Sequence, residues 1–239
     1  MKVKHLVGAF LCVLGCYACS SPKTEVQSPD GHIKMTLTVD ENGKPFYNVS
    51  VDDSLLIENS AMGFTAANGI ILAEGFQVKN TTFSSEDETW TQPWGENKKN
   101  RNHYNEMAVC LTNEDQVQLT LRFRVFDDGI GFRYEYTVPT VDSLLITDEL
   151  TTFHFHRDGT SWSIPASAET YELLYQQQPI SEVETANTPF TFKTADGVYG
   201  SIHEAALYDF PEMTLKQIGH YTLKAELAPW RDVMKARKG

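Results

Sequence analysis

The polar side chains best suited to chemistry gather between residues 90 and 106 of the sequence. Carboxylate, imidazole, phenol and carboxamide groups can all hydrogen-bond to sugar hydroxyls, and a tryptophan face suits the C–H surface of a sugar ring. A hydrogen-bonded network that holds a loop in place would use the same residue types. The candidate substrate-binding residues are therefore Trp94, Glu96, His103, Tyr104 and Asn105.

Other members of this cluster fit a structural role at least as well. Trp90 and Trp94 bracket a polar stretch and could either contact sugar or anchor a loop. Arg101 and Glu106 favour a structural role, in which their charges hold the chain together. For His103 the residue pattern leaves both roles open.

Two further patterns could suggest metal sites. His154 and His156 lie two residues apart on an expected strand, so they share one face, but a zinc site needs a further ligand that the sequence does not show. Asp127 and Asp128 precede Gly129, and this spacing predicts a hairpin turn rather than a calcium loop. No glycine-rich phosphate loop and no Ser/His/Asp arrangement is present.

The elements that must position these residues are strands. Apolar residues alternate with polar ones along most of the chain, which predicts antiparallel strands and an all-β sandwich. Two stretches, residues 81–105 and 166–186, lack this alternation and are expected to be long loops, with 167–177 helical or irregular. The expected strands are residues 33–39, 46–51, 117–125, 130–138, 151–155, 189–194, 198–203, 213–218 and 221–227.

The start of the chain predicts export. Residues 1–19 have a basic start, a short apolar run and then small residues, which is typical of a signal peptide. Cys16 or Cys19 could be the lipidated residue of a lipoprotein, and plain cleavage is the alternative. Residues 20–27 are then expected to form a polar tether. The protein is expected to be periplasmic or attached to the outer membrane, with membrane contact only through such an anchor.

Charge and cysteine content narrow the possibilities further. The formal net charge of −12 argues against a nucleic-acid partner, because phosphate binding needs a surplus of Lys and Arg. Beyond the signal region Cys110 is the only cysteine, so no internal disulfide can form. Its alternating apolar surroundings predict a buried, unreactive side chain.

Several ordered motifs together resemble the N-terminal domain of glycoside hydrolase family 97. They are residues 28–31 (SPDG), 90–96 (WTQPWGE), 101–106 (RNHYNE) and 123–135 (FRVFDDGIGFRYE), and the resemblance covers about residues 28–230. The resemblance implies a β super-sandwich of the galactose mutarotase-like type. In the family this domain is followed by a catalytic barrel that cleaves α-linked glucosides or galactosides.

The resemblance also implies a metal ligand. Residues 200–207 (GSIHEAAL) match the family motif that supplies one glutamate to a calcium ion, and this places the ligand at Glu204. Calcium takes six to eight oxygen ligands, so Glu204 needs partners from the barrel. On a strand, His203 and Glu204 would point in opposite directions.

The expected function follows from this resemblance. The chain is expected to be the N-terminal domain of an α-glycosidase, with residues 231–239 as a truncated tail, and it should be inactive without the barrel that carries the catalytic carboxylates. Calcium would bind only in the full-length enzyme. The alternatives are a stand-alone carbohydrate-binding module, with Trp90, Trp94 and Tyr104 as its platform, and a mutarotase-like enzyme with a His/Glu acid–base pair.

Overall fold

Antiparallel strands make up nearly all of the protein. The computed structural model describes residues 24–228 except for 140, 142–143, 168–169 and 209. Every strand pair in these residues is antiparallel. Helix in this part of the chain is limited to two short 3₁₀ turns, η1 (Ala67–Gly69) and η2 (Ile180–Glu182). The prediction of an all-β sandwich is confirmed.

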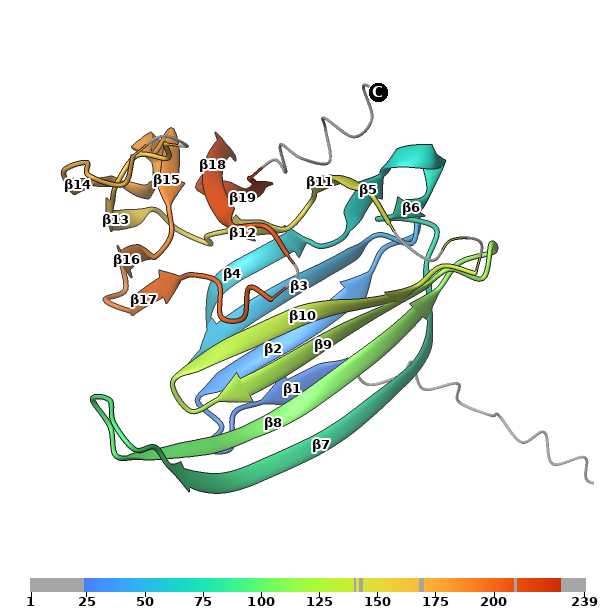
Figure 1. The fold of residues 1–239 in the computed structure, drawn as a ribbon, viewed down its shortest axis with the longest axis horizontal. Helices are drawn as coiled ribbons and strands as arrows, with labels where there is room; N and C mark the ends of the chain where they lie inside the picture. Colours follow the sequence, from blue (N-terminus) through green and yellow to red (C-terminus); the bar gives the residue numbers. More distant parts are fainter. Residues whose placement is uncertain (1–23, 140, 142–143, 168–169, 209, 229–239) are drawn as a thin grey trace, which may run out of the picture.

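Two four-stranded sheets form the sandwich (Figure 1). The first has the order β1-β2-β3-β4, with the strands β1 (Glu25–Gln27), β2 (Ile33–Val39), β3 (Pro45–Val51) and β4 (Ser54–Ala61). The second has the order β10-β9-β8-β7, with the strands β7 (Gln77–Thr91), β8 (Lys99–Thr112), β9 (Gln118–Phe126) and β10 (Gly129–Thr137). Each pair of neighbours in these sheets is also consecutive in sequence, so short turns suffice to connect them.

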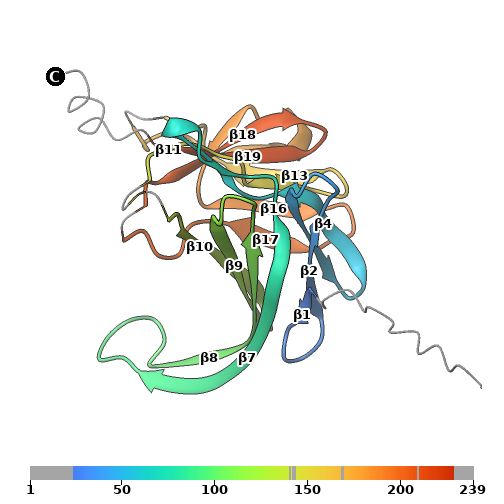
Figure 2. The same ribbon diagram turned by 90° about the vertical axis from the view of Figure 1, so that its right-hand side faces the viewer.

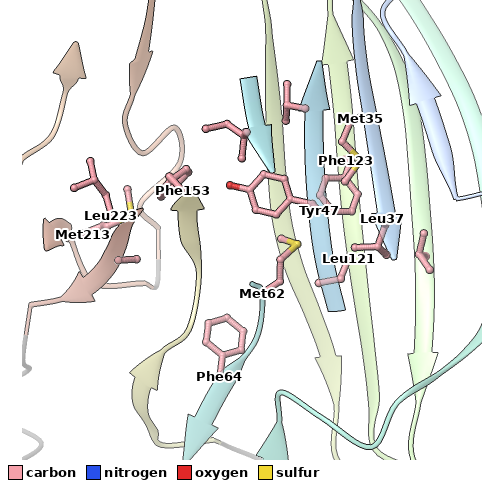
Figure 3. Packing of buried hydrophobic residues seen from close by; sticks show 14 of the residues in the cluster. Met35, Leu37, Tyr47, Met62, Phe64, Leu121, Phe123, Phe153, Met213 and Leu223 are labelled. Atoms are coloured by element: carbon pink, nitrogen blue, oxygen red, sulfur yellow. The ribbon is translucent and has the colours of Figure 1, made fainter. Parts of the chain in front are cut away.

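The core lies between these two sheets. Alternate side chains of β9, including Leu121 and Phe123, are fully buried, and they face Met35 and Leu37 of β2 (Figure 3). The Tyr47 ring of β3 lies 5.9 Å from the Phe132 ring of β10, centroid to centroid. Because strand side chains alternate, a register slip of one residue would send this whole apolar set to solvent.

Three smaller sheets cover one end of the sandwich (Figure 1). One has the order β11-β5-β6, from β5 (Phe64–Ala66), β6 (Ile71–Leu72) and β11 (Ile146–Glu149). Another has the order β12-β19-β18-β15, from β12 (Thr152–His154), β15 (Thr185–Asn187), β18 (Met213–Gly219) and β19 (Thr222–Leu227). The last has the order β14-β13-β16-β17, from β13 (Gly159–Ser163), β14 (Gln176–Pro179), β16 (Phe190–Thr194) and β17 (Tyr199–Ile202).

The prediction of a long loop at residues 81–105 is wrong. Most of this stretch belongs to a hairpin, in which β7 and β8 pair from Gln77 opposite Thr112 to Thr91 opposite Lys99. β9 accompanies β8 only as far as Tyr104, so the far end of the hairpin has two strands and curves away from the sandwich (Figure 2). Its residues face solvent on both sides, so no apolar alternation marks it in the sequence.

The expected loop at residues 166–186 is also partly wrong. β14 and η2 lie within it, β15 begins at its end, and β14 pairs with β13 so that Gln177 lies opposite Trp162. β14 has the sequence Gln-Gln-Gln-Pro and is mostly exposed, so the sequence carries no strand pattern there.

Two smaller expectations also change. Glu25–Gln27, which the sequence places in a tether, forms β1, because Val26 is buried against β2 with Met35 opposite it. Cys110 is half-buried rather than buried, since it lies on the polar face of β8 with Thr120 opposite. The predicted signal peptide and the expected tail at 231–239 lie outside the described residues. Within the described part, no helix has the length and apolarity needed to cross a membrane.

Candidate functional site

The Glu204 side chain is fixed by two neighbouring segments. β17 ends at Ile202, and Glu204 lies in the connection that leads to β18. Its Oε1 accepts a hydrogen bond from the backbone N–H of Met213 at 2.5 Å, and its Oε2 accepts one from the Thr188 hydroxyl. These contacts hold the carboxylate in one orientation at the end of a sheet.

Glu204 is half-buried and lines an open depression. The other residues of this depression are Thr188, Pro189 and His203. The expectation that His203 and Glu204 point in opposite directions applies only on a strand, and β17 already ends at Ile202, before both residues. The imidazole Nδ1 of His203 lies 2.7 Å from the backbone carbonyl oxygen of Glu204, which fixes the orientation of the ring.

This arrangement fits one ligand of a hard cation, but not a complete site. A carboxylate oxygen that accepts one hydrogen bond keeps a lone pair free, and carboxylates are the preferred protein ligands of calcium. Within the described residues, no group of three or more His, Cys, Asp or Glu side chains could hold a metal ion. A hard cation at Glu204 would need further oxygen ligands beyond those of the described residues.

A second carboxylate near Glu204 has no counterpart among the sequence predictions. Glu149, at the end of β11, is 6% exposed, and its Oε1 accepts a hydrogen bond from the Thr151 hydroxyl at 2.6 Å. Burial, aided by the negative charges of Asp148 and Glu204, raises the pKa of Glu149. Its place is set by contacts between distant segments, and no local motif marks it.

Trp94 and Glu96 lie at the tip of the β7–β8 hairpin. The Trp94 side chain is 87% exposed, and Glu96 is also exposed. The Gln92 side-chain amide donates a hydrogen bond to the Asn97 carbonyl at 2.8 Å, which ties the tip together. Trp90, at the end of β7, is half exposed.

The other three substrate-binding candidates lie where the hairpin joins the sandwich. The Tyr104 ring is buried, with the Arg124 guanidinium 4.5 Å from its centroid. Asn105 donates a hydrogen bond to the Gln27 carbonyl at 2.9 Å. His103 Nδ1 lies 3.2 Å from an Asp127 carboxylate oxygen in the β9–β10 turn. These contacts hold strands together.

The structure therefore separates the sequence candidates into two places. The five substrate-binding candidates, Trp94 among them, belong to the β7–β8 hairpin, whereas Glu204 follows β17 of a different sheet (Figure 1). Within the described residues, no hydrogen bond, ion pair or ring contact joins the two groups. Sugar binding by the hairpin residues stays a prediction that rests on the exposed tip.

The structural role expected for Arg101 and Glu106 is confirmed. Arg101 makes a bidentate ion pair across the hairpin with Asp87, at 2.7 and 2.8 Å. Glu106 is 8% exposed and accepts hydrogen bonds from Arg122 at 2.5 Å and from Arg124 at 2.7 Å. Although burial opposes it, the two guanidinium groups lower the pKa of Glu106.

His154 and His156 do share one face, as their spacing predicts. The two imidazoles both approach Glu58 of β4, at 4.0 Å and 3.0 Å respectively. These contacts bind β12 and its continuation to the edge of the sandwich.

Solved structures with this fold include sugar-cleaving enzymes. A glycoside hydrolase family 97 enzyme from Pseudoalteromonas sp. strain K8, solved with panose and with acarbose, has a TM-score of 0.81 and 37% identity. The match covers 86% of this chain and 32% of the chain of that enzyme. A β-arabinopyranosidase shares the fold, with a TM-score of 0.77 and 21% identity. That match covers 86% of this chain and 35% of the arabinopyranosidase chain. The fold and the site define a β-sandwich domain of a glycoside hydrolase.

Sequence comparison gives the family. Residues 26–238 match the family described as glycosyl-hydrolase 97 N-terminal, so the chain belongs to glycoside hydrolase family 97 and comprises its N-terminal domain. A retaining alpha-galactosidase from Bacteroides thetaiotaomicron is 24% identical over 229 residues, which is 89% of this chain and 33% of that protein. The chain thus spans about a third of the length of these relatives.

Proposed function

We propose that this chain is the supporting domain of an α-glycosidase of the α-glucosidase or α-galactosidase type, and that Glu204 supplies one calcium ligand to its active site. Catalytic carboxylates come from a separate barrel domain, so the chain alone is inactive. The observation that carries the proposal is the placement of Glu204, which is fixed by Thr188 and Met213 and opens on a depression.

The relatives support the substrate class. One is a retaining alpha-galactosidase, and another was solved in complex with panose and with acarbose. We propose that the parent enzyme of this domain acts on α-linked glucosides or galactosides. The basic start and apolar run of residues 1–19 support export, with Cys16 or Cys19 as the anchor of a lipoprotein.

The calcium role can be tested in a chimera, in which this chain replaces the matching third of the Pseudoalteromonas enzyme. Glu204→Gln removes a charged oxygen ligand and should weaken calcium binding at least tenfold in titration calorimetry. The control is Glu74→Gln, which removes an exposed carboxylate paired with Lys44 at 3.2 Å and should leave calcium affinity unchanged. Equal affinities in all three proteins would rule out Glu204 as a ligand.

The inactivity of the isolated chain needs its own assay. With calcium present, the 239-residue protein should release no nitrophenol from nitrophenyl α-glucoside or α-galactoside, because two convergent carboxyl groups are required for this chemistry. Turnover well above the buffer rate would show that the chain carries its own catalytic groups.

The exposed tip of the hairpin favours carbohydrate binding as a second candidate function. Trp94 presents most of its indole to solvent, and such a surface can stack on a sugar ring. Calorimetric titration of the isolated chain with maltose and melibiose tests this, with Trp94→Ala as the variant and Phe83→Ala of β7 as the control. Absence of heat at millimolar sugar would contradict the binding-module hypothesis.

The shared depression of His203 and Glu204 leaves the mutarotase-like alternative testable as well. An acid–base pair must converge on one space, and both residues line the same depression. Polarimetry of fresh α-glucose with and without the protein decides it. An unchanged mutarotation rate would exclude this activity.

A further inference from the structure

Two aromatic side chains stack on the β14-β13-β16-β17 sheet (Figure 1). The rings of Trp162 on β13 and Tyr199 on β17 lie 6.5 Å apart, centroid to centroid, with 17° between their planes. Trp162 is half-buried, and Tyr199 is 65% exposed. The Lys193 ammonium on β16 lies 4.9 Å from the centroid of the Tyr199 ring, in a cation–π contact. Three strands thus contribute to one pair of nearly parallel rings.

The strand register shows which residues share a face with these rings. Successive side chains of a strand point to opposite faces, and Ser161, Phe190 and Phe192 are buried on the inner face of the sheet. The outer face carries two rows of residues that lie opposite one another across the four strands. We define the aromatic platform as these eight residues: Gln177, Trp162, Thr191 and Ser201 in one row, and Pro179, Thr160, Lys193 and Tyr199 in the other.

Uncharged hydrogen-bonding groups surround the rings of the platform. Gln177, Thr191 and Ser201 are exposed, and their carboxamide and hydroxyl groups can both donate and accept hydrogen bonds. Lys193 is the only charged member of the platform, which contains no carboxylate although the whole chain has a net charge of −12. An acidic surface would suit a cation, whereas this composition suits an uncharged ligand that is rich in hydroxyl groups.

The core does not need the two stacked rings. The inner face of the same sheet already supplies Phe192, whose ring lies 4.8 Å from that of Phe155, centroid to centroid. The rings of Trp162 and Tyr199 lie on the other face, where solvent reaches both. A sugar matches such a surface, because its C–H groups stack on an aromatic face while its hydroxyls bond to polar groups beside that face.

We propose that the aromatic platform is an accessory binding site for an α-linked oligosaccharide. The choice of this sugar class rests on the proposed function. The platform is distinct from the tip of the β7–β8 hairpin, which belongs to another sheet, and it includes none of the residues that line the depression at Glu204. A sugar chain held there stays near the enzyme, which raises its effective concentration at the catalytic site.

Calorimetric titration of the 239-residue chain with panose tests the platform. A Trp94→Ala background removes the ring at the hairpin tip, so that the measured heat does not come from there. On this background, Trp162→Ala or Tyr199→Ala should weaken panose binding by about tenfold, because each substitution removes a stacking surface. Tyr199→Phe keeps the ring and should retain the affinity.

Tyr136→Ala is the matched control for Tyr199→Ala. Tyr136 is 44% exposed, and it lies on β10 in a different sheet, so its loss should leave panose affinity unchanged. Because Tyr199 is exposed, its substitution does not disturb the core. Absence of heat at millimolar panose, or unchanged affinity in Tyr199→Ala, would overturn the proposal.

Oxidation by N-bromosuccinimide locates the bound sugar without any substitution. Peptide mass spectrometry follows the oxidation of Trp162 and of Trp94 separately in the parent chain. Oxidation of Trp162 should slow by about tenfold when the panose concentration is about ten times its dissociation constant, because only the free fraction reacts. An unchanged oxidation rate at Trp162 would place the sugar elsewhere and overturn the proposal.

The platform and the proposed calcium role fail in different ways. Panose binding by the isolated chain is read without calcium and without catalytic activity. If Glu204→Gln leaves calcium affinity unchanged in the chimera while Tyr199→Ala still weakens panose binding, the platform stands and the metal role falls. If calcium binding depends on Glu204 while panose binding does not depend on Trp162 or Tyr199, the metal role stands and the platform falls.

Discussion

Arg122 donates two hydrogen bonds to Glu135 across the β9–β10 pair, from Nε at 2.8 Å and from Nη2 at 3.0 Å. Arg122 lies directly opposite Arg133 in the register, a placement that would be repulsive alone. Glu135 accepts from Arg133 as well, at 2.6 Å, and Glu106 accepts from the other side of Arg122. Ion pairs therefore join these strands, and Arg122 and Glu135 form the central pair.

This network predicts acid sensitivity. Hydrogen bonds from Arg122, followed by those from Arg133, lower the pKa of Glu135 from 4.5 to about 2. A carboxyl whose pKa is lower in the folded state stabilises it above the unfolded pKa and loses that effect as pH falls. The free energy of unfolding should therefore fall between pH 4.5 and pH 2, and part of this loss should disappear in Glu135→Gln.

Urea unfolding of both proteins at neutral pH and at an acidic pH within that window measures this effect. At neutral pH, Glu135→Gln should cost about 1 kcal/mol, because the carboxylate is 37% exposed and partly screened. Asp128→Asn in the exposed turn is the control, and its stability difference from the parent protein should not change with pH. The same pH slope in Glu135→Gln and in the parent would contradict the argument.

Gly43 is expected to resist substitution for two separable reasons. It follows β2 with a φ of +76°, and a Cβ there would lie 2.2 Å from the Phe76 backbone nitrogen. Gly31 has a similar φ of +82°, but a Cβ would meet nothing within 4 Å. Gly31→Ala should therefore lower the free energy of unfolding by about 1 kcal/mol through backbone strain. Gly43→Ala should lower it clearly more, because the close contact adds to that strain. Thermal unfolding of both variants checks the order, and similar losses would show that the close contact relaxes.

The strands that could be predicted are those that face the core on one side. β9 and β10 alternate apolar and polar residues, so even their turn at Asp127–Gly129 follows from the sequence. β7 and β14 could not be predicted, because they are exposed on both faces and their pairing is set by the neighbouring strand. β4 could not be predicted from the sequence either. Bulges or irregularities interrupt its pairing with β3, and they also interrupt the alternation of its apolar and polar residues.

The candidate site shows the same division. Glu204 follows from a local motif, whereas Glu149 becomes its neighbour only through the packing of β11 beside the other sheets. The hairpin residues share one sequence motif, yet Tyr104 is buried and Trp94 is exposed. Proximity in sequence indicates a common role, but a long two-stranded hairpin separates its tip from its base.

The buried Glu149 predicts the opposite pH behaviour from Glu135. Because burial raises its pKa in the folded state, Glu149 favours folding at low pH and disfavours it once pH rises through the folded pKa. Glu149→Gln keeps an acceptor for the Thr151 hydroxyl without the charge, so it should increase stability more at alkaline than at acidic pH. Urea midpoints at the two pH values test this, and a larger gain at acidic pH would contradict it.

Core truncation should show how much the fold depends on the sandwich interior. Phe123 is fully buried, while Phe83 of β7 is 51% exposed, so the same substitution can be compared in two environments. Phe123→Ala should cost about 3–5 kcal/mol through lost burial and a residual cavity. Phe83→Ala should change stability by about 0.5 kcal/mol or less. Denaturant unfolding measures both, and a small loss for Phe123→Ala would mean that the core collapses around the gap.

The exposed side chains of Leu174 and Tyr208 predict that the isolated chain self-associates at high concentration. Leu174 and Tyr208 present their side chains to water, and burying them between copies removes apolar area from solvent. Net negative charge opposes this contact, so association should strengthen as salt screens the repulsion. Light scattering at low and high salt measures this association.

The double variant Leu174→Ser, Tyr208→Ser should remain monomeric under conditions in which the parent chain associates. The control Trp94→Ser, at the hairpin tip, should associate like the parent. A parent chain that stays monomeric at high concentration and high salt would contradict this prediction.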